Sequence, residues 1–103
     1  MAGKAGTYVL RPQAEVDLEG IWLYTVEHWS VQQADKYYRD ILAAIKHLAF
    51  GRVIGRTVNI RDGYFKFAVG SHFIFYRING TVYDIVRILH QQQDAERHLY
   101  PTI

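Results

Sequence analysis

The strongest constraint in the sequence is an Asn-Gly pair that separates two β-rich segments. Asn79 and Gly80 lie between residues 72–78 and residues 81–90, and both segments are rich in aromatic and β-branched side chains. An Asn-Gly pair supplies the positive φ angles that a two-residue type I′ turn requires. The two segments are therefore predicted to form an antiparallel hairpin, and the turn is predicted to fix its register.

The predicted register divides the strand residues between two faces of a sheet. It places Ile78 opposite Thr81, and a third strand over residues 64–69 joins through a turn at Gly70 and Ser71. One face is predicted to lie under helices and carries Phe65, Phe67, Val69, Ile74, Tyr76, Ile78, Tyr83, Ile85 and Leu89. The other face, called the mixed face below, carries Tyr64, Lys66, Phe73, Phe75, Arg77, Asp84, Val86, Ile88 and His90. It is too apolar to be merely solvated and too charged to be plain core.

Two amphipathic helices are predicted before the sheet. Residues 13–29 and the segment from Ser30 to Ala49 place apolar side chains at spacings of three and four. Ser30 with Gln33 forms a capping box at the start of the second helix. Because almost no loop separates the helices, they are predicted to form an antiparallel hairpin that buries its apolar stripe on the sheet.

The predicted fold class is α+β in a single domain over residues 1–103. A short strand at residues 8–10 precedes the helices, and a short helix over residues 91–98 ends the chain. The predicted order is β-α-α-β-β-β with a short C-terminal helix, and the helical hairpin packs on one face of a mainly antiparallel sheet. Residues 1–6 are expected to be disordered or vector-derived.

Composition excludes several classes of function. The chain has no cysteine, which removes disulfides, thiolate catalysis and cysteine-ligated metals. Its five histidines show no metal-binding spacing, so no metal or cofactor is expected. Since no apolar run approaches the ~20 residues of a membrane span, we expect a soluble, cytoplasmic protein. Residues 51–103 carry seven basic and four acidic side chains and could face an acidic partner, but a net charge of +2 does not predict direct DNA contact.

Several motifs resemble the ParE branch of the RelE/ParE toxin superfamily. They are Ala14-x-x-Asp17-Leu18-x-x-Ile21, Arg61-x-Gly63-Tyr64, residues 70–76, residues 85–90, Asp94 and Arg97-His98-Leu99. The resemblance runs from about Tyr8 to Tyr100. It implies a non-enzymatic toxin of a type II toxin–antitoxin pair that binds DNA gyrase, stabilises its cleaved-DNA intermediate, and is neutralised by a ParD-like antitoxin.

The resemblance also suggests two sets of contact residues. The tail of a ParD-like antitoxin would find apolar side chains and cations on the mixed face, namely Phe73, Phe75, Val86, Ile88, Arg61, Lys66 and Arg77. The C-terminal segment, residues 91–100, is the expected target-facing element. The residues assigned to target binding are Arg87, His90, Asp94, Arg97 and His98.

Two alternative functions stay open. The other branch of the superfamily cleaves messenger RNA on the ribosome, which needs a general base, a general acid and cations. Lys66, Arg77 and His90 could supply part of that set, but a proton donor is missing. The second alternative is an interaction domain without toxicity.

Some of these residues also have a structural interpretation. His72 and Arg87 could hold the end of the sheet against the C-terminal helix, for instance through Asp94. Trp22 and Trp29 are expected to pack in the core or at the helix joint, which is favoured over the alternative of a contact with the antitoxin.

Overall fold

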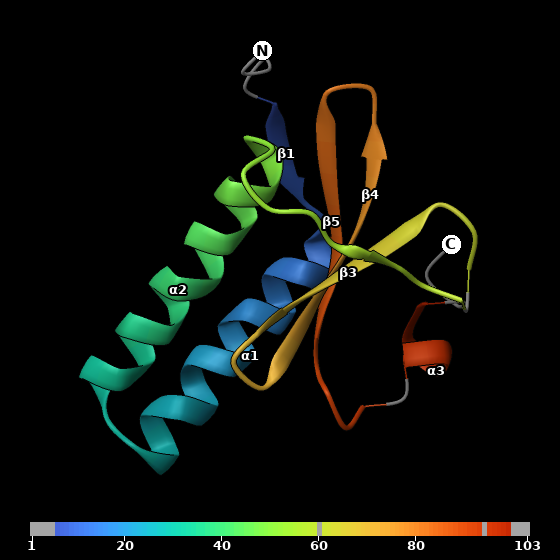
Figure 1. Cartoon of the computed structure of the whole chain (residues 1–103). Coiled ribbons are helices and arrows are strands. Elements are labelled where there is room, and N and C mark those ends of the chain that lie inside the picture. The colour runs from blue at the N-terminus through green and yellow to red at the C-terminus, as the bar shows by residue number, and fades with distance from the viewer. Residues whose placement is uncertain (1–5, 60, 94, 100–103) are drawn as a thin grey trace.

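The computed structural model describes residues 6–59, 61–93 and 95–99 (Figure 1). In chain order the elements are β1 (Thr7–Leu10), α1 (Pro12–His28), α2 (Val31–Ala49), β2 (Arg56–Thr57), β3 (Tyr64–Val69), β4 (His72–Asn79), β5 (Val82–His90) and α3 (Ala95–Leu99). The predicted α+β class is confirmed. Two details differ, because β2 was not predicted and α3 begins at Ala95 instead of Gln91.

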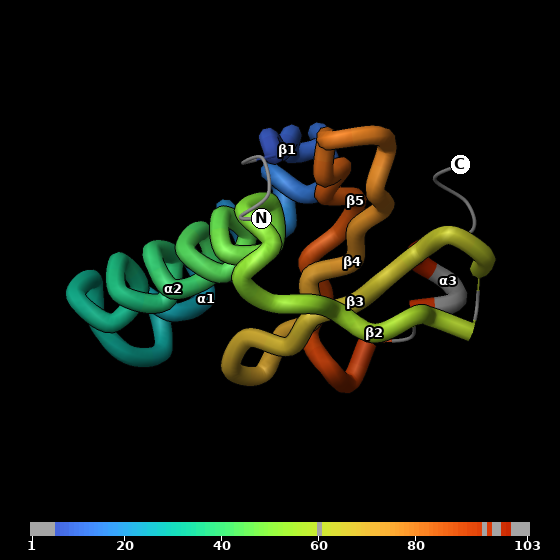
Figure 2. Tube along the Cα trace, turned by 45° about the horizontal axis from the view of Figure 1, so that its top comes forward, coloured from blue at the N-terminus to red at the C-terminus, as the bar shows by residue number. Residues whose placement is uncertain are grey.

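The five strands form one sheet in the order β1-β5-β4-β3-β2. The pair of β1 with β5 is parallel, and the other three pairs are antiparallel. The α1–α2 hairpin covers one face of the sheet, and α3 lies on the other side (Figures 1 and 2). The helices of the described part of the chain include none that is long and apolar enough to cross a bilayer.

Local signals at three points shape the helical hairpin. Pro12 begins α1 at a position where a helix needs no N–H donor. Ser30 Oγ accepts a hydrogen bond of 3.0 Å from the N–H of Gln33, which is the Ser30 half of the predicted capping box. Trp29 ends α1 and donates its N–H to Thr25 O at 2.8 Å. The joint therefore spans only Trp29 and Ser30, as the sequence predicts.

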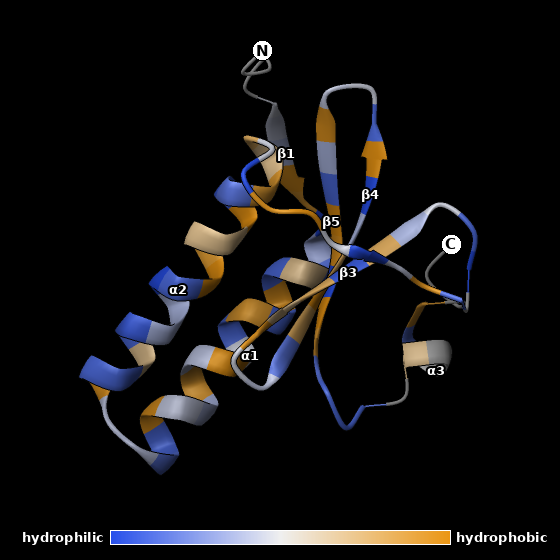
Figure 3. Cartoon of the chain, viewed as in Figure 1, coloured by the Kyte–Doolittle hydropathy of each residue, from blue (hydrophilic) through white to orange (hydrophobic). Residues whose placement is uncertain are grey.

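The main core lies between the hairpin and the sheet. The apolar side of α2 faces the strands, whereas its polar side faces outward (Figure 3). Its buried members are Ala14, Leu18, Ile41, Ala44, Ile45, Leu48, Ile74, Tyr76, Ile85 and Ile88. Phe65, Phe67, Val69 and Tyr83 pack against this cluster, as predicted, but Ile78 is 44% exposed near the hairpin turn.

The predicted register of the β4–β5 hairpin is wrong. Asn79 pairs with Val82, so the central turn residues are Gly80 and Thr81. Gly80 has a φ of +64°, and no described residue other than glycine has a positive φ. This pattern matches a type II′ turn, in which only the first central residue needs a positive φ. Ile78 therefore pairs with Tyr83, two residues from the predicted partner.

A β-bulge in the same hairpin exchanges the faces of the end of β5. Tyr76 pairs with Ile85, but Phe75 pairs with Arg87, so Val86 is the extra residue. Because side chains alternate along a strand, one extra residue reverses the faces beyond it. Ile88 and His90 consequently turn to the helix side, whereas Leu89 turns to the mixed face. These three face assignments from the sequence are therefore wrong.

A second, smaller core covers much of the mixed face. It contains Val58, Tyr64, Phe75, Val86, Leu89 and, from α3, Leu99. Asp84 is also buried on this part of the sheet, where it forms two hydrogen bonds of 2.7 and 2.8 Å with Arg11. The Arg11 guanidinium lowers the pKa of the Asp84 carboxyl below its usual value. The mixed face is thus in part an interior surface under α3.

Gly6 differs from the expectation for the N-terminal segment. Its N–H donates to Ala49 O at 3.0 Å. A Cβ at this position would lie 2.7 Å from the carbonyl oxygens of Ala49 and Thr81, so only glycine fits. The rest of that segment, residues 1–5, lies outside the described residues.

Candidate functional site

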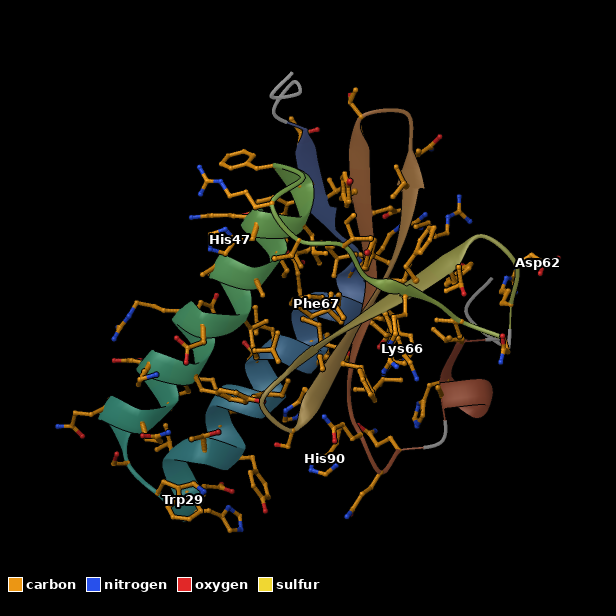
Figure 4. The ribbon with its side chains drawn as sticks, in the orientation of Figure 1. Trp29, His47, Asp62, Lys66, Phe67 and His90 are labelled. Carbon is orange, nitrogen blue, oxygen red and sulfur yellow. The ribbon has the colours of Figure 1, made fainter. Side chains whose placement is uncertain are left out.

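An open groove of about 1050 Å³ lies between α1 and the end of the sheet. It is bordered by the α1–α2 joint, the β3–β4 turn and the residues that follow β5. Its lining residues are Val16, Asp17, Gly20, Ile21, Tyr24, Thr25, Trp29, Gln33, Tyr37, Gly70, Ser71, His72, Ile88, His90, Gln92 and Gln93. Figure 4 shows Trp29 and His90 at the same end of the molecule, one from the helix joint and the other from the end of β5. Two other pockets of the described part of the chain are smaller, at about 480 and 330 Å³.

One wall of the groove is apolar and exposed. Val16 is 60% exposed, Tyr24 59% and Trp29 75%, although each is a large apolar side chain. Tyr24 stacks on His28 with ring centroids 3.9 Å apart, which holds its ring at the helix surface. The expectation that Trp29 packs in the core or at the helix joint is therefore wrong. Exposed apolar side chains gathered along a groove are typical of a surface that binds another protein.

The sequence signal for this wall is a second apolar stripe on α1. Val16, Gly20 and Tyr24 are four residues apart and lie on one side of the helix, separate from the stripe that faces the sheet. A Cβ on Gly20 would meet no atom within 4 Å, so this glycine leaves the wall open. This stripe was not predicted, because the stripe that faces the sheet dominates the apolar pattern of α1.

The floor of the groove is polar and built from hydrogen-bonded side chains. The Tyr37 hydroxyl lies 2.7 Å from His72 Nδ1 and 2.9 Å from Val69 O. The His72 ring contacts the His90 ring edge to face, with centroids 5.2 Å apart. Burial, with a smaller effect of His90, lowers the pKa of the His72 imidazole to about 4. His72 is therefore neutral at pH 7.

An ion pair between Asp17 and Arg87 lies at the side of the groove next to the edge of β5. Arg87 Nε and Nη2 donate to Asp17 at 2.8 and 2.9 Å, and both side chains are only 12% exposed. The N–H of Ile88 donates to the same carboxylate at 2.9 Å. Asp17 thus covers the edge of β5 beyond the last residue that pairs with β1. Arg87 Nη1 also donates to His98 O at 3.4 Å, which links this pair to α3.

Arg87 therefore has a structural place in the chain and is not an exposed contact residue. Among the described residues its carboxylate partner is Asp17 of α1. The residue opposite His72 is His90 and not Arg87. Of the other residues assigned to target binding, His90 lines the groove and His98 is half-buried. Asp94 lies outside the described residues, as does the side chain of Arg97.

The residues assigned to antitoxin binding divide among three environments. Lys66 Nζ lies 4.5 Å above the Phe73 ring, and the guanidinium groups of Arg61 and Arg77 lie 5.4 and 5.8 Å from the Tyr64 ring. These cations gather on the side of the sheet that carries α3 (Figure 4, Lys66). Phe75 and Val86 are buried in the second core, and Ile88 is buried in the main core. On the mixed face the three cations and Phe73 are thus half-buried, and most of the predicted apolar surface is interior.

The arrangement limits what the groove can do chemically. Asp17 is the one carboxylate among the described lining residues, and Arg87 neutralises it. No group of three histidine, cysteine or carboxylate side chains that could hold a metal occurs in the described ranges. The bulge also places His90 on the opposite side of the sheet from Lys66 and Arg77. The groove therefore does not bring His90, Lys66 and Arg77 around one point, as a base and cations for RNA cleavage would require.

Two solved structures of proteins from toxin–antitoxin systems are similar in fold to this chain. A chain of the chromosomal ParDE system from P. aeruginosa aligns with a TM-score of 0.73 and 21% identity over 84% of this chain and 96% of that one. A chain of the RelBE2 toxin–antitoxin complex from Mycobacterium tuberculosis aligns with a TM-score of 0.53 and 24% identity, covering 84% and 99% of the two chains. Both likenesses concern the fold, a small α+β domain.

The sequence comparisons identify the family to which the chain belongs. The family described as "ParE toxin of type II toxin-antitoxin system, parDE" matches residues 8–95. Toxin ParE1 of Mycobacterium tuberculosis H37Rv is 45% identical over 94 residues, and Toxin ParE1 of Caulobacter vibrioides is 41% identical over 93 residues. Each alignment covers 89% of this chain and 96% of the relative. The chain belongs to the ParE toxin family of type II toxin–antitoxin systems.

Proposed function

We propose that a ParD-like antitoxin neutralises this toxin by laying an amphipathic segment in the groove. The observation that carries the proposal is the exposed apolar wall formed by Val16, Tyr24 and Trp29. An amphipathic helix docks by burying such anchors, because removing their surface from water is favourable at about 25 cal/mol per Å². The groove volume of about 1050 Å³ and its largely neutral lining suit a segment of this kind.

The cation cluster on the mixed face has a place in the same proposal. Arg61, Lys66 and Arg77 surround Tyr64 and Phe73 on the side of the sheet opposite the groove. The acidic tail of an antitoxin that continues past the groove would meet these cations after passing the edge of the sheet. Charge complementarity of this kind mainly raises the association rate and makes it depend on salt.

A pair of variants on α1 tests the groove. Trp29→Ala removes an anchor that is 75% exposed, so it leaves folding intact but weakens binding of the cognate ParD-like antitoxin by about 10- to 100-fold. Leu23→Ala is the matched control, because Leu23 is 50% exposed on the same helix and does not line the groove. Isothermal titration calorimetry measures both. Equal affinities for the two variants would exclude docking in the groove.

We further propose that the toxin acts by binding DNA gyrase and not by catalysis. The separation of His90 from Lys66 and Arg77 by the sheet supports this proposal, because RNA cleavage needs an acid, a base and cations around one phosphate. The C-terminal segment, residues 91–100, is the proposed gyrase contact, with Asp94, Arg97 and His98 as its polar residues.

A supercoiling assay with gyrase, ATP and plasmid tests this activity. We expect loss of supercoiling and linear DNA trapped by denaturant. The R97A/H98A variant should inhibit less, whereas Arg39→Ala, an exposed change on α2, should inhibit as the natural sequence does. Unchanged supercoiling together with arrest in a translation extract would instead identify a ribosomal nuclease.

A further inference from the structure

The two histidines of the groove floor could form hydrogen bonds with a segment bound in the groove, in addition to the apolar contacts of its wall. His72 and His90 lie opposite each other on β4 and β5, and both line the groove. A neutral imidazole has one nitrogen that donates and one that accepts, so the role of its free nitrogen depends on which one carries the proton. For both rings, the hydrogen-bond partner of Nδ1 determines which nitrogen carries the proton.

Tyr37 fixes the proton of His72. The Tyr37 oxygen has contacts with Val69 O at 2.9 Å, the N–H of Ser71 at 3.2 Å and His72 Nδ1 at 2.7 Å. Its single proton must go to Val69 O, because two oxygen atoms at 2.9 Å would otherwise repel each other. His72 Nδ1 must then carry a proton and donate it to the Tyr37 oxygen. The free Nε2 of His72 is therefore an acceptor.

The turn after β5 places the ring proton of His90 on Nε2, the nitrogen that is unprotonated in His72. The N–H of Gln92 donates to His90 Nδ1 at 3.1 Å, so this nitrogen must hold a lone pair. The N–H of His90 itself donates to Gln93 Oε1 at 2.7 Å, which keeps the turn closed around the ring. The ring proton of His90 is then on Nε2, which is a donor.

Neither Nε2 atom has a hydrogen-bond partner within the described ranges. Every buried side-chain nitrogen or oxygen in those ranges does have a partner, so both Nε2 atoms must be accessible to solvent. The floor thus presents one acceptor and one donor on rings whose centroids are 5.2 Å apart. A primary carboxamide carries the complementary pair, because its oxygen accepts a hydrogen bond and its NH₂ group donates one. We propose that His72 and His90 bind the side-chain amide of an asparagine or glutamine in the docked antitoxin segment. This inference rests on the proposed docking in the groove.

The same pair discriminates against charged side chains. A carboxylate accepts at both oxygens and would face the lone pair of His72, whereas an ammonium only donates and would face the N–H of His90. The charged groups nearest to the floor do not change this, because Asp17 is neutralised by Arg87. Burial also keeps His72 from supplying a second donor at pH 7, since its pKa is lowered to about 4.

Small probes test the inference on the toxin alone. Protein labelled with ¹⁵N at histidine is titrated at pH 7 with propionamide, propionate and propylammonium at equal concentrations. We expect the Nδ1-protonated form of His72, the Nε2-protonated form of His90, and shifts of both Nε2 resonances with propionamide only. His47 is exposed on α2 outside the groove and serves as the internal control. Different tautomers, or equal shifts with all three probes, would overturn the proposal.

Binding of the cognate antitoxin separates this inference from the proposed function. His90→Phe keeps a ring against His72 but removes the donor, and we expect about 10-fold weaker binding. His72→Phe provides an independent measurement if the first variant folds poorly. If Trp29→Ala weakens binding but both histidine variants bind normally, docking stands and amide recognition is wrong. If Trp29→Ala has no effect, docking itself is wrong, and the probe titration still decides what the histidines bind.

Discussion

Replacing Asp17 with asparagine should cause one of the largest losses of stability available from a single polar substitution in this chain. Asp17 accepts hydrogen bonds from Arg87 Nε, Arg87 Nη2 and the N–H of Ile88, at 2.8, 2.9 and 2.9 Å. Asp17→Asn keeps one of the two acceptor oxygens, so at least one of these donors loses its partner. It also leaves Arg87 without its counter-charge at 12% exposure. Breaking a buried pair costs about 3–5 kcal/mol, and the retained acceptor places this variant near 3 kcal/mol.

Urea unfolding followed by circular dichroism measures this loss. A change of about 3 kcal/mol is a large part of the 5–15 kcal/mol typical of a domain, and it lowers Tm by roughly 12–24 °C at this chain length. The control is Asp40→Asn in the surface pair Lys36–Asp40, whose side chains are 63% and 47% exposed. That variant should lose less than about 0.5 kcal/mol.

A double-mutant cycle shows whether the loss comes from the pair itself. If Arg87→Met is combined with Asp17→Asn, the double variant should lose clearly less than the sum of the single losses, because no unpaired charge stays buried. A loss for Asp17→Asn as small as that for Asp40→Asn would refute the reasoning. Additive losses in the cycle would do the same.

Three further substitutions and conditions test other parts of the structure. Because the folded state holds the pKa of His72 near 4, below its ordinary value of 6.5, folding opposes protonation; stability is full above pH 6.5 and falls between pH 6.5 and 4. Solvent screening reduces this loss to about 1–2 kcal/mol, and urea midpoints of His72→Gln should lack it. Gly70→Ala should destabilise the fold by more than about 1 kcal/mol, because φ is +55° and the new Cβ would lie 2.7 Å from the Tyr37 ring. Gly20→Ala, where a Cβ meets no atom within 4 Å, should instead stabilise the fold by up to about 1 kcal/mol. Ser30→Ala should cost about 1 kcal/mol in the same assay through loss of the helix cap.

The regular elements were predictable because their signals are local. The Ser30 cap and the near absence of a loop defined the helical hairpin. Turn residues and β-branched runs placed β3, β4 and β5 within one or two residues of their observed bounds. The two-residue strand β2 could not be predicted, because Arg56 and Thr57 become a strand only by pairing with Lys66 and Phe65.

The candidate site was predicted far less well, and one residue explains much of the difference. Val86 forms a bulge that no local signal marks, and it sends Ile88 and His90 to the helix side. His90 therefore faces His72 in the groove instead of joining Lys66 on the mixed face.

The sequence by itself determined the class of fold, the order of its main elements and, through its motifs, the toxin family. Helix periodicity, caps and turns depend on residues a few positions apart, so they are visible in the chain alone. Only the tertiary structure decided that Asp17 meets Arg87 and that Tyr37 meets His72. These partners are 70 and 35 residues apart, and their meeting depends on how the hairpin sits on the sheet and on a one-residue shift in strand register.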